Sequence, residues 1–126
     1  MSDDLTTREQ LVAALTPLLP EAWRVVPYSR SLDNLDRVTV MVHASRIEHA
    51  PQAPLSQHVT TFTVSVFDPQ SDPERAQGAL DDEVGALLFA LDELPWVSWS
   101  SAEASQLPDG GPLGWDVTLE TITQKD

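Results

Sequence analysis

The sequence contains no cysteine, so disulfide bonds, thiolate nucleophiles and cysteine-ligated zinc sites are all excluded. Basic residues are also scarce, because 7 Lys and Arg face 20 Asp and Glu and leave a formal net charge of −13. Lys125 is the single lysine. Tight binding of nucleic acid requires cations that displace counterions from the phosphates. We therefore expect no stable nucleic-acid binding by the free protein.

Long apolar runs are missing as well. Nothing approaches the roughly 20 consecutive apolar residues of a membrane-spanning helix. The acidic start Met1-Ser2-Asp3-Asp4 lacks the features of a secretory signal peptide. We expect no membrane association and a protein that works or is assembled in a cytoplasm-like compartment. The 126 residues suffice for one hydrophobic core, so residues 1–126 are expected to form a single domain.

The first part of the sequence predicts a short helix and then an edge strand. Thr6 and Glu9 have the spacing of a capping box. The helix is expected to end near Pro17, because proline cannot continue the hydrogen-bond ladder. Trp23–Tyr28 favours a strand, and its Pro27 has no N–H to donate. This predicts that the strand lies at an edge of the sheet or ends there.

The middle of the sequence predicts a long β-hairpin. Valines occupy every second position from Val38, and the strand can continue to about His49. His58–Phe67 shows the same alternation of apolar and polar residues and is expected to be the partner strand. Two prolines between these segments mark the tip of the hairpin.

A second, longer helix is predicted from Pro73 to about Leu94. Asp72 is a favourable N-cap, Pro73 suits the first helical position, and Pro95 ends the helix. Apolar residues at helical spacing predict one buried stripe, formed by Leu80, Val84, Leu87, Leu88 and Leu91.

Two further strands are predicted, one beginning at Val97 and one over about Trp115–Ile122. The expected order is therefore α-β-β-β-α-β-β. Strands close in sequence favour antiparallel pairing, with the helices on one side. The predicted fold class is α+β, with a mainly antiparallel sheet of four to five strands, two helices packed on one face and a long β-hairpin extension.

The histidines His43, His49 and His58 are the candidates for a metal site. On an uninterrupted strand, His43 and His49 would share a face but lie about 20 Å apart, too far to hold one ion. His49 and His58 flank the hairpin tip and can meet across it. Two histidines without an acidic partner are a weak metal signal. We expect solvated strand histidines, no metal and no cofactor.

No arrangement of side chains in the sequence indicates catalysis. Ser100 and Ser101 lack the G-x-S-x-G frame of a nucleophile elbow. Asp81, Asp82 and Glu83 are consecutive on the second predicted helix, so they point about 100° apart and do not converge on one ion. We interpret them as a solvated acidic face. The sequence thus predicts no catalytic residues and no enzymatic activity.

The tryptophans near the end of the sequence fall into two groups. Trp99 and Trp115 lie in alternating patterns and are expected in the core. Trp96 is out of phase with Val97 and Trp99, which leaves two interpretations. It is buried beneath the second helix, or it contacts another subunit.

Several stretches, taken in order, carry a resemblance over residues 8 to 123. They are Val26-Pro27-Tyr28 with Leu32-Asp33, Thr39-Val40-Met41-Val42, Arg46-Ile47-Glu48 with Pro51 and Pro54-Leu55, Phe67-Asp68-Pro69-Gln70 leading into Asp72-Pro73, Leu80-Asp81-Asp82-Glu83-Val84, and Trp115-Asp116-Val117-Thr118. In this series the chain resembles the tail terminator proteins of actinobacterial siphophages, which are long-tailed bacteriophages.

The resemblance implies a structural virion protein without enzymatic activity. Such proteins form a ring, usually a hexamer, that caps the tail tube, stops its polymerisation and joins the tail to the head connector. The implied partners are further copies of the chain, the tail-tube protein and the head–tail connector protein. The implied location is the head-proximal end of the tail, after assembly in the host bacterial cytoplasm. Related folds occur in other head–tail connector components, which remain an alternative.

We predict that the sheet and hairpin build the contacts between subunits, around Arg46, Glu48, His49 and His58. Three further residues complete the predicted interface, namely Arg30, Arg37 and Trp96, of which the two arginines could pair with acids of a neighbour.

The acidic face of Asp81, Asp82 and Glu83 is expected to meet solvent or the ring channel. A channel with the charge of DNA would let DNA pass without specific binding. Acidity that keeps a soluble subunit monomeric before assembly explains the charge equally well.

Two rival functions belong to other classes. A monomeric acidic adaptor or inhibitor would bind a basic partner protein through its negative surface, in a salt-sensitive manner. An enzyme would need converging reactive groups, and the sequence supplies no recognisable set.

Overall fold

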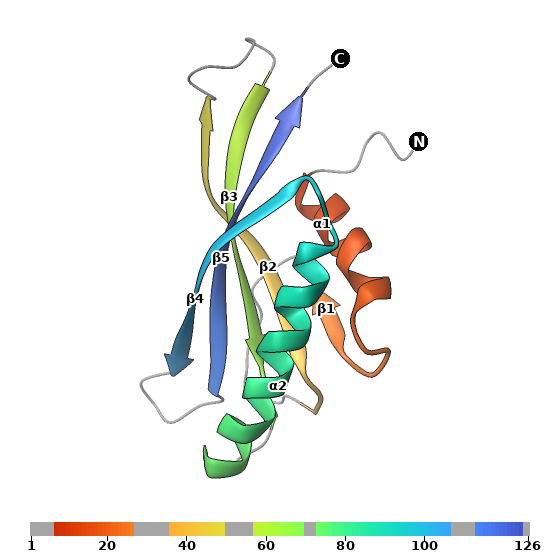
Figure 1. The fold of residues 1–126 in the computed structure, drawn as a ribbon, viewed down its shortest axis with the longest axis vertical. Helices are drawn as coiled ribbons and strands as arrows, with labels where there is room; N and C mark the ends of the chain where they lie inside the picture. The colour runs from red at the N-terminus through yellow and green to blue at the C-terminus, as the bar shows by residue number, and fades with distance from the viewer. Residues whose placement is uncertain (1–6, 27–35, 50–56, 70–72, 107–112, 125–126) are drawn as a thin grey trace.

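The computed structural model of the protein describes residues 7–26, 36–49, 57–69, 73–106 and 113–124 (Figure 1). Its elements in chain order are α1 (Thr7–Leu15), the 3-10 helix η2 (Thr16–Leu18), β1 (Arg24–Val26), β2 (Thr39–His49), β3 (Gln57–Phe67), α2 (Pro73–Asp92), β4 (Val97–Gln106) and β5 (Leu113–Gln124). The α+β class and the order of elements agree with the prediction. Neither α-helix of the described part combines the length and apolar character needed to cross a bilayer.

The five strands form one sheet in the order β1-β2-β3-β5-β4. The last four strands pair antiparallel with their neighbours, as predicted. β1 runs parallel to β2, so the expectation of antiparallel pairing is wrong for this strand. A parallel pair needs a connection of about a dozen residues, and the segment between Val26 and Thr39 has that length. The edge position predicted for the first strand is confirmed.

Both helices cover the same face of the sheet, as predicted (Figure 1). One buried cluster joins α1, the stripe of α2 and the alternating apolar residues of the strands. Its fully buried members include Leu11, Leu15, Val40, Val42, Phe62, Val64, Leu87, Leu91 and Leu119. Trp99 and Trp115 are half-buried at the margin of this cluster. We call this the helix-covered face.

The boundaries of the helices follow the predicted signals. α2 begins at Pro73 and ends at Asp92, slightly before the predicted end. α1 ends at Leu15 and tightens into η2, which contains Pro17. The predicted N-caps Thr6 and Asp72 lie outside the described residues.

The other face of the sheet has few large apolar residues, and we call it the open face. Val26, Met41 and Phe67 form a small buried cluster there. Further along, the hydroxyl of Ser65 donates a hydrogen bond to Asp116 Oδ1 at 2.6 Å across β3 and β5. The two faces therefore differ in chemistry: one is a leucine- and valine-rich core, and the other is largely polar.

The predicted long hairpin exists, but a third strand accompanies it. β2 and β3 pair as far as His49 opposite His58, and β3 pairs with β5 as far as Gln57 opposite Gln124. The end of the sheet that projects past the helices in Figure 1 carries β2, β3 and β5, and β4 reaches only its base, where Val97 pairs with Thr121. We call it the extension, and it comprises Arg46–His49, Gln57–Thr61 and Glu120–Gln124.

β2 contains an irregularity that its sequence pattern did not indicate. Its register with β3 shifts between Ala44 and Arg46, which marks a β-bulge. The bulge breaks the phase of the strand, so the register positions of His43 and His49 fall on opposite faces. The prediction that an uninterrupted strand places both histidines on one face is therefore wrong.

Candidate functional site

The sheet presents two different free edges within the described part of the chain. At one side, β1 pairs only with Thr39–Met41 of β2, and no described strand flanks the rest of β2 on that side. At the other side, β4 pairs with β5 alone. A free edge carries unpaired N–H and C=O groups that can pair with a strand of another chain. Both edges are therefore candidate assembly surfaces.

The extension brings four of the predicted interface residues together. Arg46 and Glu48 lie two positions apart on β2 and form an ion pair at 2.6 Å. His49 and His58 are register partners at its end. Ile47, between the paired charges, leaves 66% of its surface exposed. Ile47 is thus an exposed apolar side chain on the part of β2 whose outer edge is unpaired in the described chain.

The remaining predicted interface residues lie elsewhere. Arg37 precedes β2, at the opposite end of the strand from the extension. Trp96 precedes β4 and is 37% exposed, so its predicted burial beneath the second helix is wrong. Contact between Trp96 and another subunit stays a prediction. Arg30 lies outside the described residues.

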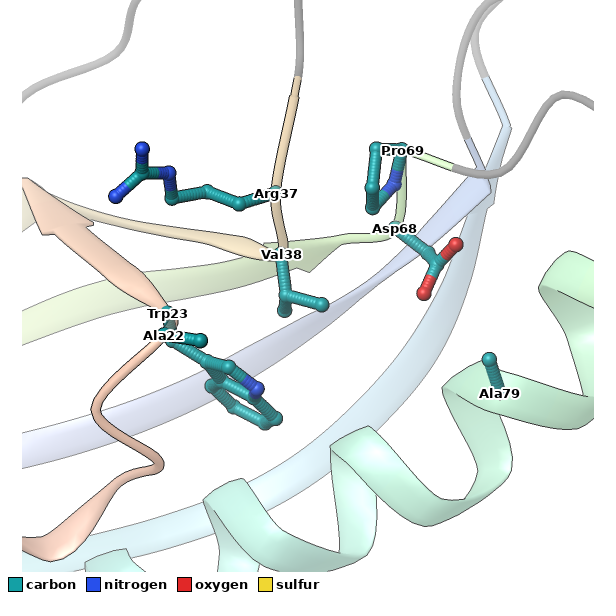
Figure 2. Close-up of a pocket in the computed structure, with 7 residues that line it drawn as sticks. All are labelled: Ala22, Trp23, Arg37, Val38, Asp68, Pro69 and Ala79. Carbon is teal, nitrogen blue, oxygen red and sulfur yellow. The ribbon is translucent and has the colours of Figure 1, made fainter.

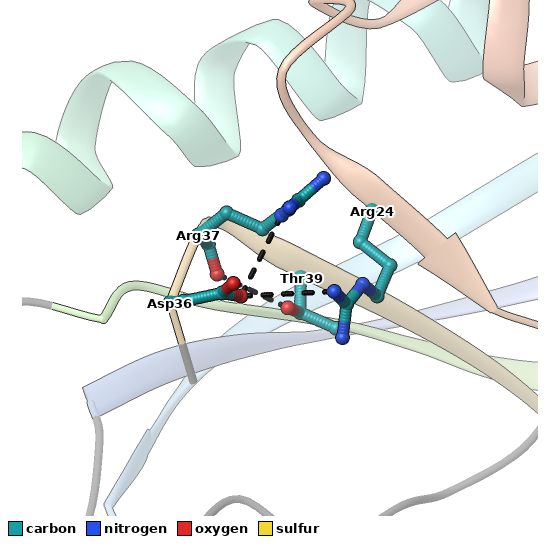
Figure 3. A network of polar contacts seen from close by, with 4 residues as sticks. All are labelled: Arg24, Asp36, Arg37 and Thr39. Atoms are coloured by element: carbon teal, nitrogen blue, oxygen red, sulfur yellow. Dashed lines mark hydrogen bonds and ion pairs between the residues drawn. The ribbon is translucent and has the colours of Figure 1, made fainter. Parts of the chain in front are cut away.

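Arg37 belongs to a small ionic network at the start of β2 (Figure 3). Asp36 lies 3.5 Å from the Arg37 guanidinium and 3.7 Å from that of Arg24 on β1. Desolvation acts to raise the pKa of the Asp36 carboxyl, but the two arginines and local hydrogen bonds hold the pKa below its ordinary value. The network joins β1 to the entry of β2, and it engages Arg37 within its own chain.

A pocket of about 550 Å³ opens beside this network, between the start of β2 and α2. Its polar groups include Arg37 and Asp68, and its walls include Trp23 and Ala79. Figure 2 shows the Asp68 carboxylate directed toward α2, while the Arg37 guanidinium points away from it. The two charged groups therefore do not converge on a common point in the pocket.

Asp68 and Glu83 form a carboxyl pair between the end of β3 and α2. Burial raises the pKa of Glu83 to about 8, and the hydrogen bond and charge of Asp68 act in the same direction, as does the charge of Asp82. Within the described residues, Glu83 Oε1 is buried without a hydrogen-bond partner. Burial, together with the neighbouring carboxyl groups, thus favours the protonated form of Glu83 near neutral pH.

The predicted acidic face is only partly correct. Asp81 and Asp82 are exposed, whereas Glu83 is half-buried. Position 83 follows Leu80 by three residues and precedes Leu87 by four, so it lies beside the buried stripe of α2. Glu83 is therefore not fully solvated, and its position on a channel surface stays a prediction.

Two surface features were not anticipated from the sequence. Phe89 on α2 is 75% exposed, on the side of the helix away from the sheet. Glu103 is exposed and is the only charged residue of β4. Glu103 could have been found from the sequence, since a single charge within a predicted strand marks a polar edge or an interface.

In the described part of the chain, no three His, Asp or Glu side chains come together to form a metal-binding group. No protein-family model matches the sequence, and a search of curated proteins finds no significant match.

Proposed function

We propose that this chain is a structural subunit of a long-tailed bacteriophage, a tail terminator that forms a ring on the end of the tail tube. The ring stops polymerisation of the tube and joins the tail to the head connector, without catalysing a reaction. The resemblance of the sequence supports this proposal. The observation that carries it is the presence of two unlike free edges on one sheet.

A ring requires a head-to-tail contact, in which one surface of each copy meets a different surface of the next. β4 and the outer part of β2 are such a pair, because they lie at opposite sides of the sheet. Joining them would cover two edges that otherwise invite uncontrolled association. The usual hexamer of the resembling proteins is the expected ring size.

The charge of the chain is compatible with a ring that surrounds DNA. A net charge of −13 per copy is compatible with a lumen of the same sign as DNA, through which DNA would pass without specific binding. Asp81 and Asp82 are exposed on α2 and are the candidates for the channel surface.

The experiment is a measurement of mass by light scattering on the purified full chain, over a range of concentrations, with and without the tail-tube subunit of the same phage. A closed ring, or a monomer that becomes a ring only on the tube, is the expected result. A ring that ignores the tube but binds the head connector would point to another connector component.

A monomeric acidic adaptor or inhibitor is the second candidate, favoured by the strong excess of acidic residues. It predicts a monomer at every concentration, indifferent to the tail-tube subunit. It also predicts binding to a cationic protein that weakens as salt screens the charges. This combination of results would overturn the terminator proposal.

A further inference from the structure

The two free edges carry different charged residues. β4 carries one charged residue, Glu103, and its side chain is exposed. The part of β2 that β1 leaves uncovered carries the exposed residues Arg46 and Glu48. Arg46 is the single Lys or Arg in the described extension, on a chain with few cations.

The pairing registers show which of these residues share a face. Arg46 is opposite Thr61 of β3, which is opposite Glu120 on the open face. Glu103 of β4 is opposite Asp116 of β5. Asp116 and Glu120 are four residues apart on β5, so they lie on the same face. Arg46 and Glu103 therefore both belong to the open face.

Their chain neighbours belong to the other face. Ile47 is opposite Thr60, one residue along from Thr61, and Ala102 is opposite the buried Val117. Ile47 and Ala102 therefore lie on the helix-covered face, and Ile47 leaves 66% of its surface exposed there. In a continuous sheet formed by β2 of one copy and β4 of the next, Arg46 would share a face with Glu103, and Ile47 would share the other face with Ala102.

We propose that neighbouring copies of the chain join by antiparallel pairing of β2 with β4, with Arg46 of one copy opposite Glu103 of the next and Ile47 opposite Ala102. This inference rests on the proposed ring and specifies its contact. The partner surface is a second copy of this chain, identified by the complementary charges and by the matching faces of the two strands.

The direction of pairing follows from the sheet. β2 and β4 run in opposite directions within one copy, because three successive antiparallel pairings separate them. A rotation about the axis of a ring leaves each strand at the same inclination to that axis. β4 of one copy therefore meets β2 of the next in the antiparallel sense.

The charges select among the registers that keep the faces in phase. With Arg46 opposite Glu103, the next open-face residue of β2, Glu48, is opposite Ser101. Sliding by two residues in one direction would instead place Glu48 opposite Glu103, and sliding by two in the other direction would leave Arg46 opposite the uncharged Ser101. Opposite charges across a strand pair are stabilising and like charges are destabilising, so the first register is favoured.

The helix-covered face adds an apolar contact in the same register. A pocket of about 370 Å³ lies between α2 and the β4–β5 pair, lined in part by Leu80, Ala104 and Trp115. Ala104 is two residues from Ala102 and is therefore diagonal to Ile47 of the neighbour, at about 7–8 Å. Ile47 would cover the mouth of this pocket and lose its exposure to water.

The test is charge reversal in the full chain, with assembly followed by light scattering, in the presence of the tail-tube subunit if the ring needs it. Arg46→Glu and Glu103→Arg are each expected to raise the concentration for half-assembly about 10-fold or more, since a repulsive pair replaces an attractive one. The double variant carrying both reversals is expected to restore assembly. Glu120→Arg is the matched control, because it makes the same charge change on the open face of β5, an inner strand that lies at neither free edge.

Circular dichroism and thermal melting check that each variant is folded. The proposed contact is overturned if the wild type forms a ring and the single variants assemble equally well, or if the folded double variant does not recover assembly. Either result leaves the proposed ring in place. A wild-type chain that never assembles, with or without the tube subunit, overturns the contact and the proposed function together. Equal weakening by Glu120→Arg would show that net charge, and not the Arg46–Glu103 pair, controls assembly.

Discussion

Replacing Glu83 by glutamine removes a carboxyl group that the fold holds in an unfavourable place. Glu83 lies on α2 beside Asp68, with Oε1 buried and unpartnered among the described residues. Burial and the neighbouring carboxyl raise the pKa of Glu83 from 4.5 to about 8. The amide has nearly the same shape and never ionises, so Glu83→Gln isolates the cost of the charge.

The direction of the pH effect follows from proton binding. Between pH 4.5 and about 8, the folded protein holds the Glu83 proton while the unfolded chain releases it. The free energy of unfolding therefore falls as pH rises through this window. The contribution of the protonated carboxyl is complete below pH 4.5 and is lost above the folded pKa of about 8.

The magnitude must be smaller than the shift in pKa alone suggests. One pKa unit corresponds to about 1.4 kcal/mol, so a shift from 4.5 to about 8 would give nearly 5 kcal/mol in a fully buried site. The Glu83 side chain is only half-buried, and solvent screens its charge. We expect a loss of about 1–2 kcal/mol for the wild-type protein between pH 5 and 9.

The assay is urea unfolding, followed by tryptophan fluorescence, at intervals from pH 5 to pH 9. The wild-type free energy should fall relative to that of Glu83→Gln, and the variant should be the more stable protein at pH 9. Asp81→Asn is the matched control, since it removes an exposed carboxylate from the same helix. Its profile should run parallel to that of the wild type. Parallel profiles for wild type and Glu83→Gln would refute the reasoning, because Glu83 would then titrate alike in both states.

Two further predictions concern packing and one hydrogen bond. A Cβ at Gly114 would lie 2.5 Å from the Val66 carbonyl oxygen and from the Phe67 ring, so Gly114→Ala should lower the free energy of unfolding by about 1–3 kcal/mol. Gly78 lies on α2 with open space around a built Cβ, so Gly78→Ala should raise the free energy of unfolding by up to about 1 kcal/mol. Urea unfolding of both variants checks this contrast, and equal stabilities of the two variants would contradict the reasoning. Trp99 Nε1 donates a hydrogen bond to Asp92 Oδ1 at 2.9 Å between β4 and α2. Trp99→Phe should therefore lower the free energy of unfolding by about 1 kcal/mol in the same urea measurement. An unchanged free energy of unfolding would show that water replaces the bond.

The elements that the sequence predicts well are those whose pattern the core enforces. Val40 and Val64 alternate with polar residues because only one face of each strand meets the helices. Leu87 and Leu91 recur at helical spacing because one side of α2 packs on that same face. Each pattern is local, so the element can be predicted without knowledge of its partners.

Strand partners and strand direction could not be predicted in the same way. Alternation does not tell which strand lies beside which, and β5 joins β3 across a separation of more than forty residues. The parallel pairing of β1 and the third strand of the extension therefore went unpredicted. The bulge between Ala44 and Arg46 was equally hidden, because the residues that follow it fit a regular strand as well as a bulged one.

The candidate site was predicted in part for the same reason. The sequence pattern puts Arg46 and Glu48 on the first strand of the hairpin, because the strand itself is predictable. Glu83 was misplaced because it was grouped with Asp81 and Asp82 by chain proximity. Its helical spacing to Leu80 and Leu87 already put it beside the buried stripe. Residues adjacent in a helix differ in direction by about 100°, so a run of acids is not one surface.

The net charge constrains how a ring of this chain can hold together. Copies that each carry −13 repel one another, so assembly cannot depend on unspecific attraction. Attraction must come from contacts that satisfy backbone groups and bring scarce cations to specific acids. Arg24 and Arg37 are already engaged with Asp36, while the partner of Arg46 is an exposed residue on its own strand. An exposed pair of this kind contributes little to the stability of one chain. If Arg46 paired with a carboxylate of a neighbouring copy instead of with Glu48, the single chain would therefore lose little stability, and a contact between subunits would form.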